Sequence, residues 1–151
     1  NDVVLNGKKL VGILTEMSAQ MNYIEYLVTG IGINANLREF PEELEDKATS
    51  LQKEIGHKVN RSALIAECME KIEENYEIFV KTQDLSGLMA AYQEALVNQD
   101  QQVRVLEPGH EYTGVARGIN AMGELLVEKE DGTITEVYAG EVSVRGLYGY
   151  V

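Results

Sequence analysis

Two long apolar runs near the start of the chain constrain its fold most. Residues 10–17 (LVGILTEM) and 23–33 (YIEYLVTGIGI) are rich in Leu, Ile, Val and Tyr, which favours β-strands. In the first run apolar side chains fill both alternating sets of positions, Leu10 and Leu14 on one and Val11, Ile13 and Met17 on the other. Both faces of this strand should therefore be buried, and the fold needs a layer on each side of it.

Other elements surround these runs. Residues 2–6 (DVVLN) predict a short strand that ends in the turn pair Asn6-Gly7. A helix is expected over 42–55 and closed by Gly56. Apolar residues recur at three- and four-residue spacing over 62–81, with Asn60 or Ser62 as the cap, and again over 86–97. Both apolar stripes, the first of which includes Cys68, should face a core.

The last third of the chain changes from helical to strand character. The polar stretch 98–102 reads as a linker or a long turn, and five short strands follow it, at 103–107, 111–119, 123–129, 133–138 and 141–145. Pro108-Gly109, Asn120-Ala121 and Asp131-Gly132 supply turns between them. These strands predict a small closed barrel of SH3-like type. The chain is thus α+β, with one domain over 1–100 and a second over 103–151.

Charge and cysteine content exclude several classes of function. Among 151 residues, 13 are basic and 25 are acidic, which gives a net charge of −12 and disfavours nucleic-acid binding by these residues. No run is long and apolar enough to span a membrane. A single cysteine, Cys68, allows no internal disulfide and fits a reducing cytoplasm. With only His57 and His110 besides, no transition-metal site can be read.

Two local patterns suggest chemistry. Gly7-Lys8-Lys9-Leu10 places a lysine at the entry of a buried strand, where its charge needs an anion or a hydrogen-bonding partner, unless both lysines are solvated turn residues. Gly30-Ile31-Gly32-Ile33-Asn34 ends the second run. Glycine inside a strand often marks the close approach of a ligand or of another backbone, and Asn34 could bind a ligand or stabilise a turn. The dinucleotide fingerprint does not match, because no third glycine follows.

Together these patterns resemble one family. Residues 1–16 (NDVVLNGKKLVGILTE) closely resemble the core segment of biotin protein ligases, where Asn-Asp normally follows a Lys-Trp-Pro that this chain lacks. Residues 30–34 stand where the family has Gly-x-Gly-Ile-Asn, and residues 48–51 (ATSL) and 140–145 (GEVSVR) also match. The resemblance runs along the whole chain in the family's order.

The resemblance implies a fold and a reaction. The fold is part of a class II synthetase-like catalytic domain, shared by biotin and lipoate ligases, with a mixed sheet and helices, followed by the barrel. The reaction is ATP-dependent: biotin and ATP give biotinyl-5'-adenylate, and a lysine of a carboxylase's biotin carrier domain then takes the biotin. Biotin, ATP and Mg²⁺ are the implied small molecules.

The resemblance also assigns roles to residues. Lys9 matches the lysine that serves both as the catalytic cation and as a biotin ligand, whereas Lys8 should face solvent. The remaining biotin-site residues would be Gly12, Leu14 and Gly30, and the nucleotide-site residues Asp2, Ile33, Asn34 and Arg145. Asp2 would order polar groups or hold Mg²⁺ through water.

Several features of the family are absent from these residues. They include the arginine-rich loop that covers the adenylate and the amino-terminal DNA-binding domain of some members. We therefore expect this chain to be inactive alone, and cytoplasmic. Whether the protein forms a homodimer is left undecided by the sequence. Two other readings also remain, a non-catalytic binding module and a lipoate ligase. The barrel and the Asn-Asp to Gly-Lys-Lys-Leu spacing favour biotin over lipoate, and turnover of biotin with ATP would separate an enzyme from a module.

Overall fold

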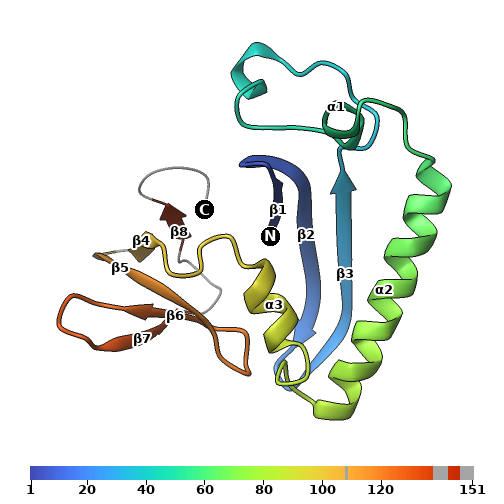
Figure 1. Ribbon diagram of the computed structural model, residues 1–151. Coiled ribbons are helices and arrows are strands. Elements are labelled where there is room, and N and C mark those ends of the chain that lie inside the picture. The colour runs from blue at the N-terminus through green and yellow to red at the C-terminus, as the bar shows by residue number, and fades with distance from the viewer. Residues whose placement is uncertain (108, 138–142, 147–151) are drawn as a thin grey trace. The chain divides into compact units, whose positions relative to one another are not determined.

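The computed structural model describes residues 1–107, 109–137 and 143–146 (Figure 1). Its contacts group into two compact units, Asn1–Leu64 and Ile65–Val151. The α+β class expected from the sequence is confirmed. In the described residues the named strands pair with one another antiparallel. A single parallel bridge outside these strand pairs joins Lys9 to Ala48.

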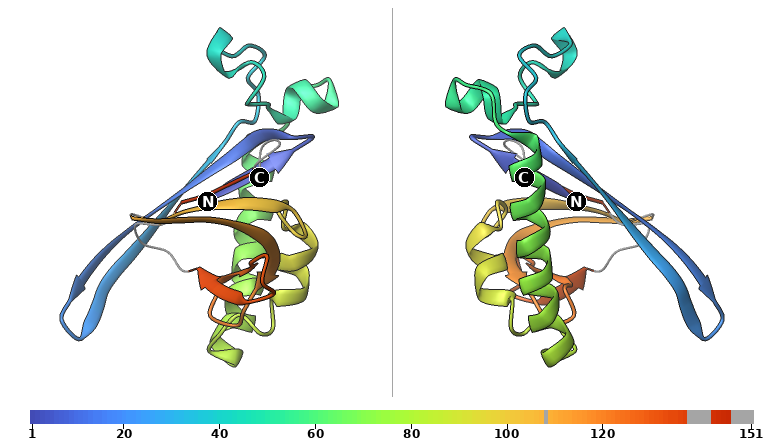
Figure 2. Two further views of the ribbon diagram at one scale, coloured as in Figure 1. Left: turned by 90° about the vertical axis from the view of Figure 1, so that its left-hand side faces the viewer. Right: turned by 90° about the vertical axis from the view of Figure 1, so that its right-hand side faces the viewer.

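The first unit is built on a three-stranded sheet. Its strands β1 (Asp2–Leu5), β2 (Lys8–Gln20) and β3 (Tyr23–Ile33) lie in the order β1-β2-β3. Asn6 and Gly7 connect the first two with φ of 50° and 76°, the left-handed pair that an Asn-Gly hairpin turn requires. Figure 2 shows β2 and β3 as one long twisted hairpin. The predicted strands are confirmed, although β2 is longer than 10–17.

The expected burial of both strand faces is wrong over most of this hairpin. Leu10 and Val11 are buried, but Leu14 is 67% exposed and Met17 is 59% exposed. The reason is the place of the covering segments. Residues after β3 return to the end of the hairpin that holds Lys9, where Lys9 bonds with residues 47–49, and they leave the distal end uncovered within this unit.

The helix expected over 42–55 is two short elements. A 3-10 turn, η1, covers Glu42–Leu44, and α1 covers Leu51–Ile55. Ser50 starts α1, because its side chain accepts a hydrogen bond of 3.1 Å from the backbone N–H of Lys53. Gly56 ends it with φ of 81°, as the sequence predicted.

The longer helices follow the sequence pattern. They are α2 (Arg61–Thr82) and α3 (Met89–Ala95), the second shorter than predicted. Asn60, rather than Ser62, caps α2: its Oδ1 accepts from the backbone N–H of Ser62 at 3.0 Å and of Ala63 at 3.2 Å. The prediction that the stripe on α2 is core is wrong for this structure, since no residue of α2 is buried.

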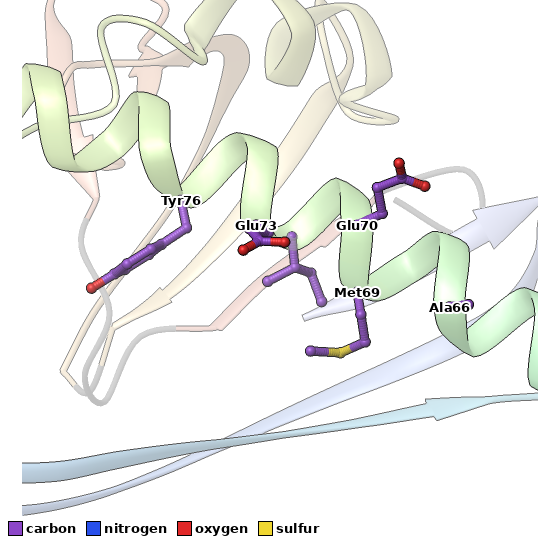
Figure 3. A pocket seen from close by; sticks show the side chains of 6 residues that line it. Ala66, Met69, Glu70, Glu73 and Tyr76 are labelled. Carbon is purple, nitrogen blue, oxygen red and sulfur yellow. The ribbon is translucent and has the colours of Figure 1, made fainter.

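The exposed stripe on α2 forms a shallow hollow along one helix. Figure 3 shows Met69 and Tyr76 extending from one side of α2 and Glu70 from another. Its lining residues are Ala66, Met69, Glu70, Ile72, Glu73 and Tyr76. Met69 is 58% exposed and Tyr76 is 64% exposed. One helix supplies every wall, so the hollow offers little enclosure to a small molecule.

The second unit contains the predicted barrel strands. They are β4 (Gln102–Glu107), β5 (His110–Ile119), β6 (Leu125–Glu128), β7 (Ile134–Val137) and β8 (Ser143–Gly146), in the order β7-β6-β5-β4-β8. The core under this sheet comprises Val103, Val105, Ala116 and Val127. The SH3-like type is confirmed, but β7 and β8 stand at opposite ends of the strand order in the described residues, so closure of the barrel stays a prediction. Pro108, Tyr138 and the start of the predicted strand 141–145 lie outside the described residues.

The polar stretch before β4 is a long turn held against β5. The Asp100 N–H donates to the carbonyl of Ala116 at 2.8 Å, and the Ala116 N–H donates to that of Gln101 at 3.0 Å. The division between domains at residues 100–103 stays a prediction, because the contacts separate the units between Leu64 and Ile65.

Candidate active site

A β-bulge decides which way Lys9 faces. Val3 pairs with Val11, but Val4 pairs with Lys9, so Leu10 is the additional residue on β2. Simple alternation would place Lys9 and Gly12 on opposite faces of the sheet. The bulge reverses that phase. The Lys9 side chain accordingly lies beside the position that a Cβ on Gly12 would occupy, with Cε 3.4 Å and Nζ 3.5 Å away.

Lys9 forms an ion pair with Asp2 on this face. Its Nζ lies 2.7 Å from Oδ1 of Asp2, and the two side chains are 40% and 25% exposed. Asp2 pairs with Gly12 across β1 and β2, which places the carboxylate and the glycine on the same side of the sheet. A pair this exposed is worth on the order of 1 kcal/mol or less, so its main effect is to orient the ammonium.

The sheet around this ion pair is poor in side chains. Gly12 pairs with Gly32, and Leu14 pairs with Gly30. Directly paired residues share a face, so the glycines and Leu14 lie on the face of Asp2. We call this the glycine face (Asp2, Lys9, Gly12, Leu14, Gly30 and Gly32). A Cβ on Gly30 or Gly32 would come no closer than 3.7 Å to a backbone oxygen, so this face is open at both positions.

The glycine face can bind an anion. An ammonium has three N–H donors, and Asp2 accepts at one short distance, so the half-exposed Lys9 retains the capacity to donate to a second acceptor. The glycines leave room for a flat or apolar group directly against the backbone, and the exposed Leu14 adds an apolar contact. The arrangement suits a ligand that joins a carboxylate or phosphate to an apolar body.

Lys8 and Ile33 lie away from this face. Lys8 points away from Asp2, and its Nζ donates to the carbonyl of Glu45 at 2.9 Å, so it is bonded rather than simply solvated. Ile33 pairs with Val11 and therefore shares the opposite face. Asn34 follows directly, and its N–H donates to the carbonyl of Leu10 at 3.0 Å. The structure thus groups Asp2, Gly12, Leu14 and Gly30 with Lys9, but not the side chain of Ile33.

Arg145 belongs to the second unit. Its backbone lies in β8 opposite Arg104, and its side chain is outside the described part of the molecule. Within the described residues, no three His, Cys, Asp or Glu side chains gather into a group that could hold a metal ion. No helix in the described ranges has the length and apolar character to cross a membrane.

Sequence reasoning did not identify the segment around Thr49 that hydrogen-bonds the backbone of Lys9. Thr49 and Ser50 are buried at 1% and 0% exposure, although both are polar. The Ser50 hydroxyl donates to the carbonyl of Leu37 at 2.5 Å, and the Thr49 hydroxyl donates to the carboxylate of Glu54. Residues 48–51 entered the family resemblance, but no pattern in the sequence connects Glu54 to them.

Comparison with known proteins shows which proteins this chain resembles. Residues 100–145 match the family model of the biotin protein ligase C-terminal domain. The chain is 33% identical over 146 residues to the bifunctional ligase/repressor BirA of Bacillus subtilis, covering 95% of this chain and 44% of that protein. It is 29% identical over 144 residues to the biotin–[acetyl-CoA-carboxylase] ligase of Mycobacterium tuberculosis, covering 94% and 50%.

Solved structures agree with these relatives. The apo biotin protein ligase from Aquifex aeolicus superposes with a TM-score of 0.83 at 32% identity, over 97% of this chain and 62% of that one. The same ligase in complex with biotin and ATP gives 0.80 at 30% identity, over 97% and 60%. This chain belongs to the biotin protein ligase family, and it spans about half the length of the curated relatives it matches.

Proposed function

We propose that this chain is part of an ATP-dependent biotin protein ligase and that Lys9 is its catalytic cation. The observation that carries the proposal is the oriented ammonium of Lys9, 2.7 Å from Asp2 on an otherwise side-chain-poor glycine face. The relatives named above are ligases, and one was solved with biotin and ATP together. A cation over a small-residue surface is what the meeting of biotin's carboxylate with a nucleotide requires.

The chemistry follows from charge. When the carboxylate of biotin attacks the α-phosphate of ATP, negative charge accumulates on two groups that repel one another. A fixed ammonium between them offsets this repulsion and is most effective in the transition state. The products are biotinyl-5'-adenylate and pyrophosphate. A lysine amine of a carrier domain then attacks the mixed anhydride, so that biotin is joined through an amide and AMP leaves.

The proposed roles of the other residues follow their positions. Gly12 and Gly30 let biotin approach the backbone, and Leu14 contacts its apolar part. A side chain at position 12 would also meet the stem of Lys9, so this glycine makes room for the catalytic residue itself. Asn34 and Ile33, at the end of β3, would serve the nucleotide side. Arg145 remains a nucleotide-site proposal.

Mg²⁺ is expected to accompany ATP. Asp2 is the acidic residue of the site, but its Oδ1 is paired with Lys9 at 2.7 Å, and no three His, Cys, Asp or Glu side chains gather into a metal site among the described residues. An ATP-bound Mg²⁺ would therefore take most of its ligands from phosphate oxygens and water, as this ion commonly does.

The complete protein is proposed to act on a biotin carrier domain and to reside in the cytoplasm. Because the chain spans about half of its curated relatives, we infer that residues 1–151 alone have little or no ligase activity. We also propose the division into a catalytic portion, 1–100, and a barrel, 103–151. The match of residues 100–145 to the C-terminal domain model supports this division.

Replacement of Lys9 tests the proposal. In the full-length protein, Lys9→Ala should slow formation of biotinyl-adenylate about a hundredfold or more, which is on the order of 3 kcal/mol of lost transition-state stabilisation. ATP binding should change much less. Rapid-quench measurement of the adenylate gives the rate, and titration calorimetry gives the affinity.

The neighbouring lysine provides a matched control. Lys8→Ala removes the same charge one residue earlier, but it removes a contact to the carbonyl of Glu45 rather than to Asp2. It should leave the rate within about threefold of the unmodified protein. A near-normal rate for Lys9→Ala, or equal losses for the two lysines, would refute the assignment.

A further inference from the structure

The backbone of Lys9 is fixed by a segment that follows β3. The Lys9 N–H donates to the carbonyl of Lys47 at 2.8 Å, and the Lys9 carbonyl accepts from the N–H of Thr49 at 2.9 Å. Residues 47–49 therefore bond both polar groups of the Lys9 backbone. Because Leu10, the next residue, is the bulge, the direction of the Lys9 side chain depends on how firmly this segment is held.

One carboxylate ties this segment to the turn before β2. Oε1 of Glu54 accepts from the hydroxyl of Thr49, and Oε2 accepts from the amide Nδ2 of Asn6 at 2.6 Å. Asn6 lies in the turn that joins β1, which carries Asp2, to β2, which carries Lys9. Glu54 thus links the segment that bonds the Lys9 backbone to the turn that precedes β2, although it lies on α1 and is not part of the glycine face.

The two hydrogen bonds differ in how replaceable they are. The Thr49 side chain is buried, so without Glu54 its hydroxyl would lose its acceptor where water has little access. Asn6 is exposed and can bond to water instead. The pKa of Glu54 is lowered, first by the hydroxyl of Thr49 and then by the amide of Asn6, which agrees with a carboxylate held as an anion by two donors.

We propose that Glu54 is a positioning residue for Lys9. It acts through Thr49 and Asn6, which hold the bulged start of β2 so that the ammonium lies over Gly12 and beside Asp2. This inference rests on the proposed function only in naming Lys9 as the catalytic cation. The geometry makes Glu54 a determinant of the rate of adenylate formation, with little influence on the affinity for ATP.

The test uses Glu54→Ala and Glu54→Gln in the full-length protein. Glu54→Ala should lower the maximal rate of adenylate formation about tenfold and change the KM for ATP by less than about twofold. Glu54→Gln keeps an oxygen for the Thr49 hydroxyl and should retain at least about half of the rate. Glu43→Ala, which removes an exposed acid from η1, is the matched control and should leave both parameters unchanged.

A double-mutant cycle separates positioning from general stabilisation. If Glu54 acts through Lys9, Glu54→Ala should have almost no further effect on the rate in a Lys9→Ala background, although it should still lower Tm by the same amount. An equal loss of rate in both backgrounds would overturn the inference, because the effect would then bypass Lys9. The same conclusion would follow if Glu54→Gln were as slow as Glu54→Ala.

The cycle also distinguishes this inference from the proposed function. A slow Lys9→Ala variant together with an unaffected Glu54→Ala variant would remove the positioning role and leave the catalytic assignment intact. A normal rate for Lys9→Ala would refute the catalytic assignment itself, whatever Glu54→Ala does. Each variant is assayed well below its measured Tm, so that loss of folding does not enter the rates.

Discussion

A single methyl group added at Gly114 should destabilise the barrel unit strongly. Gly114 is buried on β5, and a Cβ built there would lie 2.5 Å from the carbonyl oxygen of Glu128 and 2.6 Å from Cγ1 of Val127. Ordinary contact begins near 3.4 Å, so β5 and β6 would have to move apart by most of an ångström. Both obstacles lie on β6, and the carbonyl oxygen is part of the backbone.

The magnitude follows from overpacking. Forcing additional atoms into a packed core typically costs about 1–3 kcal/mol, and this site belongs at the upper end because a backbone oxygen cannot rotate away. With a slope of about 2 kcal/mol per molar urea, a loss of 2 kcal/mol would lower the urea midpoint by about 1 M. Urea denaturation followed by far-UV circular dichroism measures the midpoint, and hydrogen exchange of the β5 and β6 amides localises the loss.

Gly30 is a matched control on a strand of the first unit. A Cβ there meets only the carbonyl oxygen of Leu14 at 3.7 Å, and its φ is not left-handed. Gly30→Ala should therefore be neutral or raise stability by up to about 1 kcal/mol, because alanine restricts the unfolded chain. An unchanged midpoint for Gly114→Ala, with normal protection of β5 and β6, would refute the tight approach of these strands.

Two further predictions concern pH and the extent of the chain. The pKa of Asp131 lies below its ordinary value of 3.8, chiefly because the Thr133 hydroxyl and N–H donate to it. Its contribution to stability is therefore complete above that value and is lost as pH falls through the lower folded pKa. Asp131→Asn should make the urea midpoint depend less on pH between about pH 4 and pH 2, and an unchanged pH dependence would contradict this. Residues 1–151 alone should transfer little biotin to a carrier domain, and a separately produced amino-terminal portion of a full-length relative should restore some transfer; full activity without it would show that the site is complete here.

The sequence predicted the elements better than their burial. Alternating apolar residues located β2 and β3, and three- and four-residue spacing located α2 to within one residue at each end. These patterns report that a surface is apolar, but not which element covers it. Leu14 and Met69 illustrate the limit: each fits a buried stripe, and each is more than half exposed in the structure.

Short elements between the regular ones were the hardest to predict. The run 42–55 has helical composition, yet Ser50 starts a new helix there by accepting from the N–H of Lys53, and the residues before it turn back toward Lys9. Serine competes for backbone N–H groups and so favours the start of a helix over its interior. The sequence contains that signal, but the start of the helix at Ser50 rather than earlier depends on the tertiary hydrogen bonds of residues 47–49.

The position of Lys9 could not have been derived from strand periodicity. Lys9 and Gly12 are three residues apart, and an uninterrupted strand would set their side chains on opposite faces. The resemblance to biotin protein ligases nevertheless assigned both to one binding site. The bulge at Leu10 reconciles the two, because it brings Lys9 onto the face of Gly12 and Asp2. On a regular strand, a lysine two residues before a glycine would share its face without a bulge. The three-residue spacing of Lys9 and Gly12 therefore indicates a shared site only together with the hydrogen bonds that hold the bulge. Glu54 takes part in that arrangement, because its carboxylate bonds both Thr49 and Asn6.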